Sequence, residues 1–266
     1  MFLSTAAKYI SLSWEIIKIN ILSAMEYRIS FLTQVFGMIV NDVGFALLWV
    51  IFFLKFPSVN GWTFQDSALL FAISTVSFSF VMISARGAHY LARNIAKGEL
   101  DYFLSFPKNV LWHVSISKTE ISAIGDLIFG FIIFFFSGSI SFEKFGLFLL
   151  VSVFAAIIFF GFTIITQSLS FYFGNFEEAA DQLFHALLGF TLYPQTTFYG
   201  ALKFIMFTII PAFFVATLPV ELIKNFSWKW FLVLVVFAIC IFIAAVIVFN
   251  RGLKKYESGN LINVKM

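Results

Sequence analysis

Two acidic residues inside apolar segments are the side chains best placed for chemistry in this 266-residue chain. Asp42 follows Asn41 in the middle of one apolar segment, and Asp126 lies in the first half of another. A carboxylate is costly in hydrocarbon, so each must face a bundle interior or water. Each one either lines a polar pathway, binds a proton, or only bonds to neighbouring helices, and the sequence favours none of these roles. Neither apolar segment contains a Lys or Arg to pair with them, which argues against an ion relay.

The densest patch of mixed charge is the polar segment Arg93–Pro107. Leu91 and Ile95 lie four residues apart, as on one face of a helix, and Gly98 can end that helix in a left-handed conformation. Glu99 then begins a second short helix, where a carboxylate suits the positive N-terminal end. Pro107 ends the segment. The pattern predicts two short helices joined at a glycine.

The second of these helices has an apolar side made by Leu100, Phe103 and Leu104. A compact amphipathic knob of this kind fits a groove on a soluble partner. A helix resting on lipid headgroups explains the same apolar side equally well. The pattern leaves both interpretations open.

Motifs for catalysis and nucleotide binding are missing. The sequence contains no G-x-x-x-x-G-K-[ST], H-E-x-x-H, C-x-x-C or G-x-S-x-G run. The histidines His89, His113 and His185 are far apart, so we expect no metal site. Cys240 is the one cysteine and cannot form an intrachain disulfide. This chain therefore does not bind nucleotide through a P-loop.

The elements that carry these residues are membrane spans. The mean hydropathy is +0.97 and 61% of residues are hydrophobic, against about 45–50% in a soluble domain. The net charge of +3 comes without any basic run long enough for nucleic acid. A span needs about 20 mainly apolar residues. The predicted spans are 29–54, 67–89, 119–140, 146–173, 183–199 and 229–250.

A further apolar stretch, 201–223, is interrupted by Pro211 and Pro219. With six spans, the N-terminus, the loop Arg86–Lys118 and the basic tail share one side, which then holds most of the Lys and Arg residues and is cytoplasmic. A seventh span would move the tail outside. We therefore expect 201–223 to enter from outside and turn back. The alternative makes 201–223 a full span and 183–199 the re-entrant piece.

Residues 8–26 repeat apolar groups at helical spacing, which predicts a helix in the headgroup plane or one packed against the bundle. The acidic residues Glu177, Glu178 and Asp181 are expected to form a solvated turn or a second docking point. The predicted partition is a cytoplasmic helix over 1–28, a transmembrane domain over 29–250 with a polar loop at about 90–110 and a re-entrant region at about 200–225, and a cytoplasmic tail over 251–266.

Short motifs in a fixed order resemble the permease subunits of type-2 ABC exporters, in the roughly 260-residue branch of ABC-2 family transporter proteins. The longest of them runs from Ile95 to Pro107 as I-x-x-G-E-L-D-x-x-L-x-x-P. The others, spread over nearly the whole chain, are Tyr27-Arg28 with Phe31-Leu32, Gly61-Trp62, Tyr193-Pro194, Ile210-Pro211, Pro219, and Gly252-Leu253-x-x-Tyr256-x-Ser258.

The resemblance implies an all-α fold with six spans, an N-terminal interfacial helix and outer re-entrant helices, in a prokaryotic inner or plasma membrane. It implies that the loop between spans two and three docks on a separate ABC ATP-binding subunit. Two such subunits, carrying ATP and Mg, would pair with two permeases, identical or similar, and this chain would hold no cofactor. The residues it implies for the docking are Lys97, Gly98, Glu99, Leu100, Asp101, Leu104 and Pro107.

Two other functions compete with an exporter permease. A stand-alone secondary transporter or channel would depend on Asp42 and Asp126 and would need no nucleotide. A membrane enzyme acting on lipids would need a convergent set of His, Asp or Ser residues, which the sequence lacks. The 40 Phe residues suit an amphipathic or lipid-like substrate, and contact with membrane lipid explains them as well.

Overall fold

The computed structural model describes residues 2–138, 141–194 and 197–257, and the chain is helical throughout these ranges apart from short connections. Within them, the one pairing of β type is an isolated bridge between Val59 and Trp62, in the turn that precedes α3 (Phe64–Ala85). The all-α class expected from the sequence is confirmed.

Four stretches of the described chain are long and apolar enough to cross a membrane. The first is α2 (Arg28–Lys55). The second runs from α3 through the 3-10 turn η1 (Arg86–Tyr90) into α4 (Leu91–Ala96), and the third from α8 (Phe142–Ser168) into α9 (Ser170–Phe173). The fourth is α13 (Trp228–Leu253). The two remaining predicted spans are helices of 14 and 15 residues, α7 (Ala123–Phe136) and α10 (Glu177–Thr191).

The span predicted at roughly 119–140 contains a shorter helix than expected, because α7 begins only at Ala123 and ends at Phe136. Residues before it form an irregular link that is tied to the end of α3. The backbone N–H of Glu120 donates to the Met82 carbonyl at 2.9 Å, and its carboxylate binds Arg86 at 3.1 Å. These bonds replace those that a helix would have made, so hydropathy alone overestimated the length of the span.

The predicted solvated turn at Glu177–Asp181 was also wrong. These residues form the first turns of α10, where Glu177 and Glu178 lie at the positive end of the helix. The helix ends at Thr191, ahead of Pro194, whereas the predicted span ran from 183 to 199; residues 195–196 of that range lie outside the described chain. Acidic residues favour the first turn of a helix, and this preference placed the start of α10 earlier than hydropathy predicted.

The stretch 201–223 is broken as its prolines predict. It consists of α11 (Ala201–Thr208), a turn through Pro211, a π turn η3 (Phe213–Thr217) and α12 (Leu218–Lys224). Pro219 has no N–H to give to the carbonyl four residues earlier, and the chain widens into π geometry at that place. Each helical piece is too short to cross a bilayer.

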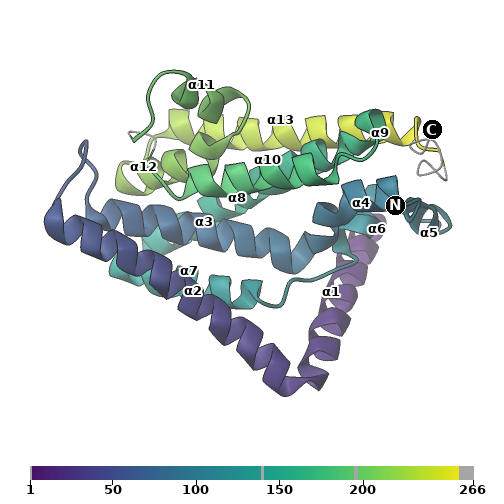
Figure 1. The fold of residues 1–266 in the computed structure, drawn as a ribbon, viewed down its shortest axis with the longest axis horizontal. Helices are drawn as coiled ribbons and strands as arrows, with labels where there is room; N and C mark the ends of the chain where they lie inside the picture. Colours follow the sequence, from purple (N-terminus) through teal and green to yellow (C-terminus); the bar gives the residue numbers. More distant parts are fainter. Residues whose placement is uncertain (1, 139–140, 195–196, 258–266) are drawn as a thin grey trace.

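The bundle has α3 and α8 at its centre, packed against α7 on one side and α13 on the other. Figure 1 shows the start of the chain, α4, α5, α6 (Val110–Ile116), α9 and the end of α13 gathered at one end of the bundle. The turn between α2 and α3 lies at the opposite end, with α12. The polar loop, the start of α1 and the end of α13 therefore share one end of the bundle, which is the arrangement that the charge count predicts.

The N-terminal helix α1 (Phe2–Glu26) diverges from the bundle and meets α2 at a bend (Figure 1). Polar contacts hold it to the region of α6: Trp112 Nε1 donates to Ser13 Oγ at 3.1 Å, and the Asn109 N–H donates to the Tyr9 hydroxyl at 3.2 Å. Its apolar residues Ile10 and Trp14 stay exposed. The helix thus contacts the protein on one face and leaves an apolar face uncovered.

Candidate functional site

The polar segment folds as the sequence predicts, into α4 and the short helix α5 (Leu100–Leu104) with Gly98 between them. Gly98 has a φ of +74°, in the left-handed region that favours glycine. The N–H groups of Lys97 and Gly98 close the end of α4 on the carbonyls of Arg93 and Ile95. We refer to Leu91–Leu104 as the α4–α5 segment.

The inner side of the α4–α5 segment is part of a hydrophobic core of its own. Leu91, Ile95 and Leu100 are fully buried. They pack in one cluster with Ile164 of α8 and Phe249 of α13. Leu100 therefore anchors the segment to its own chain instead of offering a surface to a partner. The amphipathic pattern is explained by the protein core.

Polar bonds reinforce this attachment. The buried side chain of Gln167, near the end of α8, accepts a hydrogen bond from the Ala92 N–H at 3.0 Å. Its amide nitrogen donates to Asp181 of α10 at 3.2 Å, and His89 Nε2 lies 3.4 Å from the same carboxylate oxygen. Ser170 donates to the Ala92 carbonyl at 3.3 Å. The segment is thus connected to α8, α9 and α10.

The outer side of the segment mixes charge with exposed aromatic and aliphatic groups. Tyr102 and Leu104 keep 62% and 43% of their surface exposed. Phe106 is also exposed and stacks edge-on with Tyr102. Aromatic residues are enriched in protein interfaces, and the rim around them is polar. The exposed charged side chains beside them are Arg93, Lys97, Glu99 and Asp101.

Asn94 of α4 is buried. With its amide nitrogen oriented toward Glu99 and Tyr90, it donates to the Glu99 carboxylate at 3.2 Å and to the Tyr90 carbonyl at 3.3 Å. This contact spans the Gly98 turn. Pro107 is exposed three residues beyond the end of α5. The Asn94 contact therefore ties the two sides of the turn together.

The chain returns to the segment after α13. The Tyr256 hydroxyl lies against the Asp101 carboxylate, and its ring packs on Phe171 of α9. Burial first, and then that carboxylate, raises the pKa of Tyr256 to about 12. The two residues lie in separate sequence motifs, and nothing in the sequence pairs them. Ser258 of the same motif lies outside the described residues.

His113 of α6 packs edge-on against Phe103 and Phe106. Burial, followed by the nearby charge of Lys108, lowers the pKa of His113. A neutral imidazole at this place continues the aromatic layer beneath α5.

In the described part of the chain, no group of three or more His, Cys, Asp or Glu is arranged to hold a metal ion.

The two acidic residues of the apolar segments come together. Asp42 of α2 and Asp126 of α7 are 5% and 3% exposed, and their side chains are in hydrogen-bonding contact. Asn41 is exposed on α2, and its side chain reaches the Asp42 carboxyl. The three predicted polar residues therefore form one cluster, at a place separate from the α4–α5 segment.

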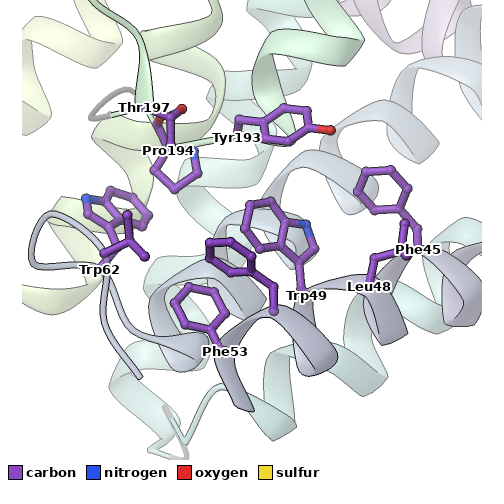
Figure 2. A pocket seen from close by; sticks show the side chains of 10 residues that line it. Phe45, Leu48, Trp49, Phe53, Trp62, Tyr193, Pro194 and Thr197 are labelled. Carbon is purple, nitrogen blue, oxygen red and sulfur yellow. The ribbon is translucent and has the colours of Figure 1, made fainter. Parts of the chain in front are cut away.

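At the end of the bundle opposite the α4–α5 segment, aromatic side chains line a cavity of about 320 Å³ (Figure 2). Trp49 and Phe53 of α2 face Tyr193 and Pro194 across it, and the rings of Trp49 and Tyr193 are 5.6 Å apart. Trp62 is buried in the cavity wall. The cavity suits an apolar group.

These features define a helical membrane protein that lacks a nucleotide-binding motif of its own. Residues 39–259 match the model of the family described as ABC-2 family transporter protein. The match covers most of the chain, and the chain belongs to this family: it is a multi-pass membrane protein of ABC transport. The matched range includes the α4–α5 segment and the Asp42–Asp126 pair. No curated protein and no solved structure gives a significant match.

Proposed function

We propose that this chain is the permease subunit of an ATP-driven exporter, energised by a separate ATP-binding subunit that docks on the outer side of the α4–α5 segment. The observation that carries the proposal is the segment's two-sided construction. Its inner side is fixed to α8, α9 and α13, and its outer side presents Tyr102, Leu104 and charged residues. A force applied outside is passed to the spans, because the inner contacts leave the segment little freedom.

The proposed topology has six spans, with α7 and α10 completing the four long ones, and with both chain ends in the cytoplasm of a prokaryotic cell. The distribution of Lys and Arg supports this orientation. In it, α11 and α12 form an outer re-entrant hairpin. Two permeases and two ATPases, which carry ATP and Mg, complete the transporter. ATP closes the ATPase dimer, and each α4–α5 segment moves with it.

The substrate we propose is amphipathic or lipid-like. The aromatic cavity beside Trp49 and Trp62 lies at the outer end in this topology, and its lining is almost wholly apolar. Lys224 lies near it, 5.7 Å from the centre of the Trp62 ring, where it binds Asp66 at 2.9 Å. An acyl chain or apolar ring fits such a wall.

Co-purification tests the proposal. The tagged chain, purified from the cells that naturally produce it, is expected to retain an ABC ATPase. The double substitution Glu99→Lys and Asp101→Lys should release the ATPase and abolish ATP-dependent transport while the chain remains inserted. Glu143→Lys, an exposed charge reversal at the opposite end of the bundle, is the matched control. Undiminished transport in the double variant would contradict the proposal.

A stand-alone carrier is the second candidate, and the buried Asp42–Asp126 pair is the observation that favours it. Such a carrier would move its substrate in vesicles that contain neither ATPase nor nucleotide. Membership of the ABC-2 family supports the first candidate instead. Transport that depends on added ATPase separates the two.

A further inference from the structure

We propose that Asp42 and Asp126 form a proton-binding site that joins α2 to α7, with one proton held between the two carboxyl groups. The site is independent of the ATPase and of the proposed substrate. It rests on the meeting of two acidic side chains that come from different helices and are both more than nine-tenths buried.

The two helices approach closely enough for the carboxyl groups to touch. Gly125, next to Asp126, has no side chain to separate them, and a Cβ there would clash with the Val35 carbonyl oxygen and crowd Met38 of α2. Small residues at helix crossings allow this approach in membranes. Asp42 lies two helical turns beyond Val35, on the same side of α2, where it meets Asp126.

Two buried carboxylates in contact cannot both be ionised, because each disfavours the charge of the other and neither is well solvated. In the described chain, no Lys or Arg forms an ion pair with either one. A hydrogen bond between two carboxyl groups needs a proton on one of them. One Asp42 oxygen, Oδ2, is buried with no hydrogen-bond partner, which leaves an acceptor free inside the site.

The surroundings supply little competing charge. Asn41 bonds to Asp42, and Glu120 is the further carboxylate whose charge acts on Asp126. Arg86 holds Glu120 at 3.1 Å, so that charge is largely compensated. The other charged side chains on the elements packed against the pair are Lys8, Glu15, Lys18, Glu26, Arg28, Lys55, Asp66 and Lys118.

The position of the pair gives the proton a structural role. Few residues of α2 are fully buried along its apolar length, and the helix packs chiefly on α7. Asp42 is one of its two buried residues. A single shared proton therefore completes the hydrogen bond between Asp42 and Asp126 that links α2 to the bundle. Loss of that proton places two negative charges in contact and drives α2 from α7.

Labelling of the full-length chain with a hydrophobic carbodiimide, which reacts with protonated carboxyls in apolar surroundings, tests the site. We expect one label per chain, found by peptide mass spectrometry on Asp42 or Asp126. Asp66 and Glu120, which are held by Lys224 and Arg86, should stay unlabelled. Two labels per chain, or none at acidic pH, would overturn the proposal.

Single substitutions separate a shared proton from two independent acids. In Asp42→Asn, labelling of Asp126 should require a solution more acidic by about 1–3 pH units, the size of the interaction between charges in contact. Asp126→Asn should have the same effect on Asp42, which provides a second variant if one fails to fold. An unchanged pH profile in a folded variant, or loss of labelling on addition of sodium ions at constant pH, refutes the shared proton.

Discussion

The Tyr256 hydroxyl lies against the carboxylate of Asp101, so the segment that follows α13 braces the α4–α5 segment from its own chain. The contact joins two parts of the sequence that are far apart. It places a phenol, kept neutral, beside the charge that we expect to face the ATPase. We therefore expect a movement of α5 to displace the end of α13.

Alkaline solution should weaken this contact. The pKa of Tyr256 rises from 10.0 to about 12 in the folded chain, so the folded state holds its proton more firmly than the unfolded state does. The stabilisation is complete below pH 10 and is lost as the pH rises toward 12. The melting temperature of the wild type should fall over this pH window by more than that of Tyr256→Phe. Equal drops would refute the pairing.

Two leucines of α5 should behave in opposite ways. Leu100 is fully buried, so Leu100→Ala should lower the free energy of unfolding by about 2–5 kcal/mol. Leu104 is 43% exposed, so Leu104→Ala should leave stability nearly unchanged and weaken ATPase binding. Chemical unfolding and co-purification measure the two effects. A stability loss at Leu104 equal to that at Leu100 would mean that the outer side is not free for a partner.

Gln167 should transmit motion without touching the ATPase. Gln167→Leu leaves the Ala92 N–H without its acceptor, which should cost about 1–3 kcal/mol of stability. It should also lower transport relative to ATP hydrolysis in the assembled complex, because α8 is no longer bonded to α4. Thr163→Val, which removes a buried hydroxyl bonded within α8 itself, is the control. An unchanged ratio of transport to hydrolysis argues against this route.

Gly98 should be needed for the turn between the short helices. Gly98→Ala forces an alanine to a φ of +74°, at a cost of about 1–2 kcal/mol. Gly146→Ala, at a helical position in α8 with open space around it, should instead stabilise by about 0.5–1 kcal/mol. Thermal shifts of the two variants should have opposite signs. A stable Gly98→Ala variant with full transport would contradict the fixed turn.

Local patterns predicted local structure well. The glycine between two apolar pairs predicted the turn at Gly98, and prolines predicted the break in 201–223. Hydropathy failed where a single charged residue binds another element, as Glu120 does with Arg86. Apolar periodicity located the inner face of α5 but could not tell that Leu100 meets the chain's own core.

Contacts between the side chains of distant segments could not be predicted from the sequence. Asp42 and Asp126 were each recognised as unusual, and nothing in their spacing shows that α2 and α7 cross beside Gly125. Asp101 and Tyr256 were likewise known only as parts of separate motifs. Periodicity gives the face that a residue occupies on one helix, whereas a site depends on which faces meet.

Site-directed cross-linking tests docking on the α4–α5 segment most directly. In a Cys240→Ser background, Leu104→Cys is expected to cross-link to the ATPase subunit in membranes, with a yield that changes when ATP is added. Phe142 is 93% exposed at the start of α8, and Phe142→Cys should give no such product. A cross-link from position 142 and none from position 104 would contradict the account.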